Sequence, residues 1–388
     1  MLKLVLGASG SGKTTLLYAR IRARAEAGKR SILLVPEQFT SSTEARIYRE
    51  LGDALSGMVE SYSFTSLAEH ILAALGGAAV QTLTDAGRAV LVRRALEELQ
   101  DNVHYYYRHR RSAAFCQMAA TIDELKSAGL SGQQLQELAR DCGTESAKLG
   151  ELALIFQGYE SLLAGTGMDP ADRLELAADR LEAALARDEL PDFLREREVF
   201  IDEFDTFNAP KKRLMGAMLA ALPAVTVALC EDGAPMQPGD LELFSGAKQV
   251  AAQLRQLARK NGAQVAAPEL LRRDLRHKDA PGLAALTELL ETGSCTPPES
   301  APELRLFAAA SREEEARCAA AAIRRLMRQG VRCGKIAVVC RDISLYRAAV
   351  RYEFRQRSHC TATSPPPRSS AHPLRRCGRC WHCCGART

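Results

Sequence analysis

The sequence predicts an α/β protein whose parallel sheet is interrupted by a long, all-helical insertion. Two strand–loop–helix units follow one another within residues 1–51, which is the pattern of a parallel sheet with crossover helices. Strand-like runs are nearly absent from 65–194, where amphipathic helical patterns repeat instead. Apolar runs with the length of buried strands return at 198–202 and 224–229.

The first unit contains a glycine-rich loop between a predicted strand at 2–6 and a predicted helix at 14–27. Its sequence, GASGSGKT, matches G-x-x-x-x-G-K-[ST] in the context that this motif requires. The glycines let backbone N–H groups converge on phosphate oxygens, and the helix N-terminus adds positive potential. We expect Lys13 to contact the β- and γ-phosphates of ATP and the Thr14 hydroxyl to bind Mg²⁺. The expected nucleotide-binding residues are Gly7, Ser9, Gly10, Ser11, Gly12, Lys13, Thr14 and Thr15.

The second unit begins with a predicted strand at 31–35 that Pro36 ends. Ser41 and Glu44 have the spacing of a capping box and predict a helix that runs toward Leu51. Residues 35–40 follow the strand at the sheet edge where open α/β folds bind ligands. Gln38 is therefore a candidate nucleotide contact, although the segment also fits a DNA-backbone contact or a plain turn.

The predicted insertion contains amphipathic helices at 86–98, 115–128, 149–163 and 170–186. Asp169 is a good N-cap because Pro170 follows it at the first helical position, and Ser66 with Glu69 predicts another capped helix start. The segment 104–111 interleaves tyrosines with cationic residues. It suits either the stacking of single-stranded bases or a connection between packed helices.

Acidic residues follow the predicted strand at 198–202. A phosphate-binding loop needs a carboxylate on a nearby strand to hold the metal, and we assign this role to Asp202. Glu203 is then the candidate that polarises the attacking water, and a solvated acidic turn is the alternative. Asp202 lies 189 residues after Lys13, whereas small P-loop kinases and GTPases place the two residues much closer.

A linker at 293–302 precedes a further α/β unit, with predicted strands at 304–308 and 335–340 and a helix at 311–328 capped by Ser311. Arg341 directly follows the second strand and is a candidate arginine finger for the γ-phosphate, or else a surface arginine. The final segment, 355–388, has seven arginines, no acidic residue and five of the twelve cysteines. We expect a disordered, aberrant tail, of the kind that a shifted reading frame produces, and an accidental rather than zinc-binding cysteine pattern.

The remaining bulk properties are those of a cytoplasmic protein. The hydrophobic fraction is 46%, and no run approaches the roughly 18 apolar residues of a membrane-spanning helix. A secretory signal is not evident, and the seven cysteines before the tail are scattered as reduced thiols are. Without the arginine-rich tail the chain is nearly neutral, so a nucleic-acid site has to be a local patch.

Together, the phosphate loop and five further segments resemble the AddB subunit of the bacterial AddAB ATP-dependent helicase/nuclease. These segments are ILLVPEQFT at 32–40, SFTSL at 63–67, ELK at 124–126, FIDEF at 200–204 and IAVVCRD at 336–342. The resemblance implies a superfamily-1 helicase-like fold: a RecA-like P-loop domain at 1–64 and 195–292, a helical insertion at 65–194 and the start of a second RecA-like domain at 303–354. It also implies work with the AddA subunit, in a heterodimer, on double-strand DNA ends and single strands. That work is resection for recombinational repair, with recognition of a Chi-type sequence.

The chain departs from the family pattern in two ways. Members are much longer and end in a nuclease domain with a cysteine-ligated iron–sulfur cluster, so neither nuclease activity nor that cluster is expected here. Many members have glycine after the metal-binding aspartate, where this chain has Glu203, so ATP hydrolysis is less easily excluded. Two other interpretations stay open: a P-loop small-molecule kinase or ATP-gated regulator, and a nonfunctional truncated gene product.

Overall fold

A computed structural model describes residues 1–77, 81–106, 112–234 and 243–358. The chain divides into two compact units, Met1–Ala301 and the part that begins at Pro302. Each unit has a hydrophobic core of its own. In the described part of the chain, no helix is both long enough and apolar enough to cross a bilayer.

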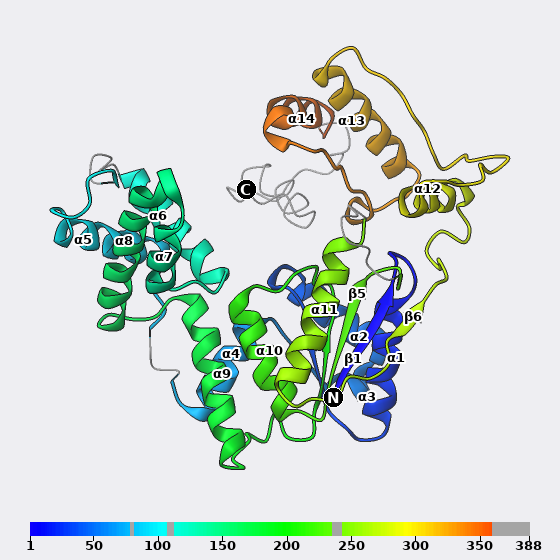
Figure 1. The fold of residues 1–388 in the computed structure, drawn as a ribbon. Coiled ribbons are helices and arrows are strands. Elements are labelled where there is room, and N and C mark those ends of the chain that lie inside the picture. The colour runs from blue at the N-terminus through cyan, green and yellow to red at the C-terminus, as the bar shows by residue number, and fades with distance from the viewer. Residues whose placement is uncertain (78–80, 107–111, 235–242, 359–388) are drawn as a thin grey trace, which may run out of the picture. The chain divides into compact units, whose positions relative to one another are not determined.

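The first unit is built on a six-stranded sheet in which every strand pair is parallel (Figure 1). The strand order is β3-β2-β4-β5-β1-β6. The strands are β1 (Leu2–Gly7), β2 (Ser31–Leu34), β3 (Val59–Tyr62), β4 (Glu198–Ile201), β5 (Ala224–Cys230) and β6 (Glu269–Leu271). The predicted parallel α/β sheet is therefore confirmed, whereas its edge strands β3 and β6 had no clear sequence signal because they are short and only partly buried.

The register brings distant parts of the chain to one edge of the sheet. Gly7 pairs with Cys230, Leu34 pairs with Ile201, and Ile201 pairs with Val227, so β2 and β4 end three residues before β1 and β5 at the same edge. The carboxyl ends of parallel strands meet at one edge, where the connecting loops form ligand sites. The glycine-rich loop after β1 and the acidic residues after β4 therefore emerge on the same side, with β5 between their strands.

Helices cover both faces of this sheet (Figure 1). One face carries α1 (Lys13–Glu26), α2 (Thr40–Leu51) and α3 (Asp53–Ser56), whose apolar side chains pack with Val5, Leu33 and Phe200 of the strands. The other face carries α4 (Phe64–Leu75), α9 (Pro170–Ala186), α10 (Ala209–Ala221) and α11 (Ser245–Lys260). Successive strand residues alternate between the two cores, as Leu4 and Val5 do, which is why the strands read as continuous apolar runs.

Four further helices pack around a core of their own, which includes Val92, Ile122, Leu135 and Phe156. They are α5 (Asp85–Glu98), α6 (Ser112–Ser127), α7 (Gly132–Arg140) and α8 (Ser146–Ala164), with a 3-10 turn at Gly143–Glu145. The helical interval of the sequence thus contributes to two cores, since α4 and α9 pack on the sheet. The domain boundaries expected from the sequence stay a prediction.

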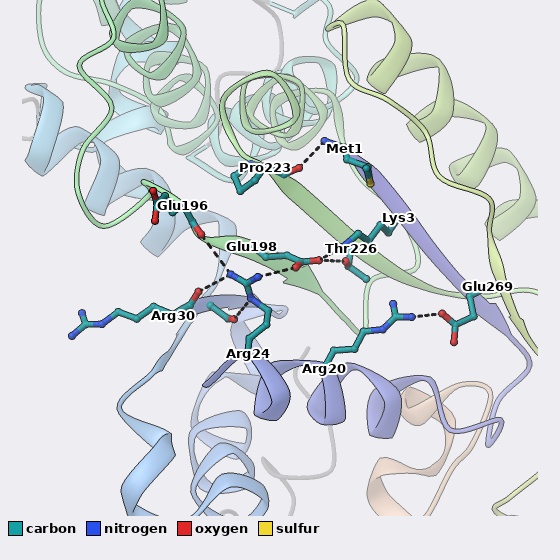
Figure 2. A network of polar contacts seen from close by, with 11 residues as sticks. Met1, Lys3, Arg20, Arg24, Arg30, Glu196, Glu198, Pro223, Thr226 and Glu269 are labelled. Carbon is teal, nitrogen blue, oxygen red and sulfur yellow. Dashed lines mark hydrogen bonds and ion pairs between the residues drawn. The ribbon is translucent and has the colours of Figure 1, made fainter. Parts of the chain in front are cut away.

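A partly buried polar network joins the amino ends of the strands to α1 (Figure 2). The Glu198 carboxylate accepts hydrogen bonds from Lys3 Nζ at 2.8 Å and from the Thr226 hydroxyl at 3.0 Å. Arg24 of α1 completes the network, with its guanidinium 3.3 Å from the same carboxylate. Because Glu198 is buried, these partners offset the cost of removing its charge from water. The network fixes β1, β4, β5 and α1 together at the edge opposite the glycine-rich loop.

Two predicted helix starts are wrong. Helix α2 begins at Thr40 after a 3-10 turn at Glu37–Phe39, so Ser41 lies inside the helix and does not cap it. Helix α4 is capped by Ser63, whose hydroxyl accepts from the Ser66 backbone N–H at 3.1 Å while the Ser66 hydroxyl accepts from the Ser63 N–H at 2.8 Å. Both helices begin before the residues that were predicted to cap them. The predicted caps Asp169 and Ser311 are confirmed.

The second unit contains α13 (Arg312–Arg328), a 3-10 turn at Cys333–Lys335 and α14 (Ile343–Ser358), and the helices pack through Ala316, Ala349 and Val350. The strands predicted at 304–308 and 335–340 are wrong, since neither segment pairs with a strand in the described ranges. Leu306 is 101% exposed and Val339 is 89% exposed. Their apolar pattern suits a strand, but a strand also needs a hydrogen-bonded neighbour.

The predicted tail at 355–388 falls mostly outside the described residues, which end with α14 at Ser358. Residues 355–358 are helical rather than irregular, because they form the end of α14. The cysteine pattern of the tail lies wholly outside the described residues. The remaining helix of the first unit is α12 (Pro281–Thr292).

Candidate nucleotide site

The glycine-rich loop joins the end of β1 to the start of α1 and has the backbone conformation that its glycines permit. Gly10 and Gly12 have φ values of 86° and 92°, in the left-handed region that side chains with a Cβ rarely adopt. The loop is also tightly packed, because a Cβ on Gly7 would lie 2.7 Å from the carbonyl oxygen of Leu271 in β6.

Lys13, the first residue of α1, folds back over this loop. Its ammonium donates hydrogen bonds to the carbonyl oxygens of Gly7 at 2.6 Å and Ala8 at 2.8 Å. Burial lowers the pKa of Lys13. The positive charge is therefore held above the segment where the motif expects phosphate oxygens.

Asp202 directly follows β4 and is buried at the same edge of the sheet. Its carboxylate accepts a hydrogen bond at 3.0 Å from the backbone N–H of Glu203, and the nearby Thr14 hydroxyl also stabilises its charged form. Burial raises the pKa of Asp202, while these contacts and the charges of Arg46 and Lys13 act in the opposite direction. The structure thus brings together the phosphate loop and the acid that the sequence proposed as its metal partner.

These groups line one cavity of about 520 Å³. Its lining residues are Ser9, Gly10, Gly12, Lys13, Thr14, Thr15, Arg46, Asp202, Glu203, Phe204, Asp205, Ala228, Cys230, Leu275 and Arg276. Most of the expected nucleotide-binding residues are among them. A more apolar cavity of about 540 Å³ shares Ser9, Phe204, Asp205 and Cys230 with it.

Some of the candidate residues do not line this cavity. Gly7 and Ser11 belong to the loop but are buried beneath its surface, and Ser11 is 5% exposed. Gln38 lies exposed on the 3-10 turn after β2, away from the cavity lining. Arg341 is exposed in the second unit, and its role as an arginine finger stays a prediction.

Glu203 reaches the cavity from a strained backbone position. Its φ is +65°, which is uncommon for a residue other than glycine. Burial of its carboxyl group raises the pKa of Glu203, the neighbouring Asp202 charge raises it further, and Arg46 lowers it. A strained residue at the mouth of a site is an observation from which a functional role can be inferred.

Sequence reasoning missed two cations of the cavity. Arg46, in the middle of α2, places its guanidinium 4.9 Å from the ring centroid of Tyr18 on α1. Burial raises the pKa of Tyr18 to about 12, so this tyrosine is neutral beneath the guanidinium. Arg276 follows β6, and only recognition of that short edge strand would have placed it beside the loop.

A phosphate loop between a strand and a helix, facing an acid on a nearby strand of a parallel sheet, defines the first unit as a P-loop type of α/β domain. A family model described as "ADDB, N-terminal" matches residues 4–287, and the chain belongs to this family. The resemblance expected from the sequence motifs is therefore confirmed.

The similar proteins are each named as a subunit of an ATP-dependent helicase/deoxyribonuclease. The one from Desulforudis audaxviator is 34% identical over 371 residues, which cover 91% of this chain and 31% of the relative. Those from Moorella thermoacetica and Symbiobacterium thermophilum are 33% and 32% identical, covering 91% and 89% of this chain and 32% and 31% of the relatives. The chain spans about a third of the length of these relatives.

Proposed function

We propose that the first unit binds ATP and Mg²⁺, as the helicase-like portion of an AddB-type subunit that acts in the repair of DNA double-strand breaks. One observation carries the ATP proposal: Lys13, Thr14 and Asp202 converge on one cavity although they come from distant parts of the chain. Convergence of an ammonium, a hydroxyl and a carboxylate at a phosphate loop is the arrangement that binds a nucleotide with its metal.

Each side chain has a distinct role in this proposal. Lys13 exchanges its two carbonyl partners for β- and γ-phosphate oxygens, and the glycine loop supplies backbone N–H donors. The Thr14 hydroxyl and the Asp202 carboxylate hold Mg²⁺, which neutralises phosphate charge when bound. Glu203 orients the water that attacks the terminal phosphate.

The strand order favours a RecA-like, superfamily-1 helicase-like domain over a small-molecule kinase. Strand β5 lies between β1, which leads into the phosphate loop, and β4, which carries the acid. Lys13 and Asp202 are also 189 residues apart, whereas small P-loop kinases and GTPases place the two residues much closer in the sequence. We accordingly retain the helicase-type fold for the first unit. That the second unit starts a second RecA-like domain rests on the resemblance alone, since the strands predicted there are not formed in the part of the chain that the structure describes.

The proposed partners follow from the relatives. Their name describes a helicase and deoxyribonuclease that depends on ATP. We extend this to binding of DNA ends and single strands, pairing with an AddA-type subunit and recognition of a Chi-type sequence. An ATP-gated regulator without DNA remains the second candidate, because the phosphate loop alone would serve either protein.

Substitution of Lys13 by alanine tests the nucleotide proposal. We expect Lys13→Ala to abolish measurable binding of Mg-ATP in calorimetric titrations, because the phosphates lose the ammonium that the loop holds over them. Lys29→Ala is the matched control, since Lys29 is exposed beyond the other end of α1. Unchanged ATP affinity in Lys13→Ala would refute the assignment.

Fluorescence anisotropy with a labelled forked duplex tests the DNA proposal. We expect binding at low salt that weakens as salt rises, because contacts with phosphates release counterions. ATP binding without any DNA binding at low salt would favour the ATP-gated regulator. If the natively folded chain bound neither ligand, a nonfunctional product would be the better interpretation.

A further inference from the structure

The segment 272–277, directly after β6, lies against the glycine-rich loop. The backbone N–H of Leu275 donates a hydrogen bond to the carbonyl oxygen of Gly10 at 3.0 Å. The Arg276 guanidinium donates to the Ser9 hydroxyl at 3.0 Å. Two neighbouring residues therefore bind two neighbouring residues of the loop, one through its backbone and one through its side chain.

A turn centred on Asp274 holds Arg276 in this position. Asp274 Oδ1 accepts hydrogen bonds from the backbone N–H groups of Arg276 at 2.9 Å and His277 at 3.1 Å. Its other oxygen, Oδ2, lies 2.8 Å from His277 Nδ1. The turn orders the backbone before Arg276 contacts any ligand, which reduces the entropy that binding has to overcome.

The glycine at position 10 permits this close approach. A Cβ on Gly10 would lie 2.8 Å from the Cβ of Arg276 and 3.0 Å from Asp274 Oδ1. Glycine is thus required here by its neighbours as well as by its φ of 86°. The two segments fit each other at a point that the loop motif itself leaves unspecified.

Arg276 and Lys13 are two cations that line the same cavity. Burial lowers the pKa of Lys13, and the nearby positive charge of Arg276 lowers it further, while Asp202 opposes the change. The two side chains reach the cavity from different elements, the segment after β6 and helix α1. The two positive charges repel each other when the cavity is empty of anions. An anion bound between them would be attracted by both charges and would offset this repulsion.

We propose that Arg276 binds the terminal phosphate of a nucleoside triphosphate, so that the first unit by itself distinguishes a triphosphate from a diphosphate. This inference rests on the proposed function and adds a specificity residue to it. The guanidinium exchanges the Ser9 hydroxyl for phosphate oxygens, with which it forms charge-assisted, bidentate hydrogen bonds. Arg276 thereby supplies, from the unit that holds the loop, the contact that Arg341 was expected to make.

The test compares the affinities of a non-hydrolysable Mg-ATP analogue and of Mg-ADP in the full chain. We expect Arg276→Ala to weaken binding of the ATP analogue about tenfold, the size of a lost charged hydrogen bond, and to leave ADP affinity nearly unchanged. Arg276→Lys keeps the charge without the bidentate geometry and falls in between. Arg273→Ala is the matched control, because Arg273 is an exposed arginine of the same segment that does not line the cavity.

Several outcomes would overturn this inference. If Arg276→Ala lost affinity equally for the ATP analogue and for ADP, Arg276 would only stabilise the loop. If the variant gained affinity for both ligands, the contact of Arg276 with the loop would only compete with phosphate binding. Melting temperatures without ligand show whether each variant folds. If Arg276→Ala does not fold, the affinities of Arg276→Lys for the two ligands test the inference instead. If the unsubstituted chain bound neither ligand, the proposed function would be refuted. If it bound both ligands with the same ratio of ATP-analogue to ADP affinity as Arg276→Ala, only the role of Arg276 would be refuted.

Discussion

At the scale of one residue, Glu203 combines a strained backbone with a carboxylate that lines the candidate nucleotide cavity. Its backbone has the left-handed conformation that glycine adopts readily. For a residue with a Cβ this conformation raises the free energy of the folded state by roughly 1–2 kcal/mol. A glycine at this position would avoid this cost. In this chain the strain is present at a residue whose carboxylate lines the candidate nucleotide cavity.

A pair of substitutions at this position separates the backbone from the carboxylate. We expect Glu203→Gly to be more stable than Glu203→Ala by up to about 1 kcal/mol, because both lose the carboxylate but only glycine relieves the strain. Urea denaturation of the two variants measures the difference. If Glu203→Ala proved the more stable variant, the left-handed conformation would not be the source of strain at this position.

Single residues were predictable where a motif specifies both residue type and neighbours. The positions of the glycine-rich loop and Asp202 at one cavity were predicted in this way, since the loop lies between a clear strand and a clear helix and the acid follows an apolar run. Arg46 and Arg276 were not found, because an arginine on a helix or after a short strand has no local signal. Only the packing of α2 and β6 against their neighbours places them at the cavity.

At the scale of elements, a buried ionic cluster attaches the separate helical core to the helices on the sheet. Lys126 of α6 lies 2.9 Å from Asp169 and 2.8 Å from Asp172, at the start of α9. Asp169 also accepts a hydrogen bond from the Tyr159 hydroxyl of α8 at 2.7 Å. Since Asp169 is fully buried and Lys126 is nearly so, the two charges depend on each other.

Removal of the lysine should therefore be costly. We expect Lys126→Met to lower the free energy of unfolding by about 3 kcal/mol, because it leaves buried carboxylate charge without its partner. Chemical denaturation monitored by circular dichroism measures this change. The control is Arg93→Ala, which breaks an exposed ion pair with Glu97 on α5 and should cost less than about 0.5 kcal/mol. Similar losses in the two variants would contradict the buried-pair argument.

The helices predicted from periodicity are all present, although α7, α10, α11 and α12 were missed, whereas two strands predicted at described residues are not formed, and the difference has a physical reason. An amphipathic helix satisfies its own backbone hydrogen bonds, so the periodicity of 115–128 or 170–186 was enough to find α6 and α9. A strand depends on neighbours that local sequence does not identify. The segments 304–308 and 335–340 have strand-like residues without a paired neighbour, while β6 is paired despite a weak pattern.

At the scale of the molecule, the candidate nucleotide cavity is assembled by the sheet and not by any one segment. Its lining residues come from the loop after β1, from α2, from the turn after β4, from β5 and from the segment after β6. The sequence motifs predicted the first and third of these contributions. The others follow from the strand order, which places β5 beside β1 and β6 on the other side of β1.

All the residues that line this cavity, and the three cores of the sheet and helical regions, lie before the boundary at Ala301. We therefore expect a fragment of residues 1–301 to fold and to bind the ATP analogue within about twofold of the full chain, a change of less than about 0.5 kcal/mol. Calorimetric titration and thermal unfolding of both proteins test this.

Arg341→Ala in the full chain is the matched variant and should likewise leave affinity for the ATP analogue unchanged. If the fragment and Arg341→Ala both lost affinity for the ATP analogue but not for ADP, then Arg341 and not Arg276 would contact the terminal phosphate, and the site would require both units.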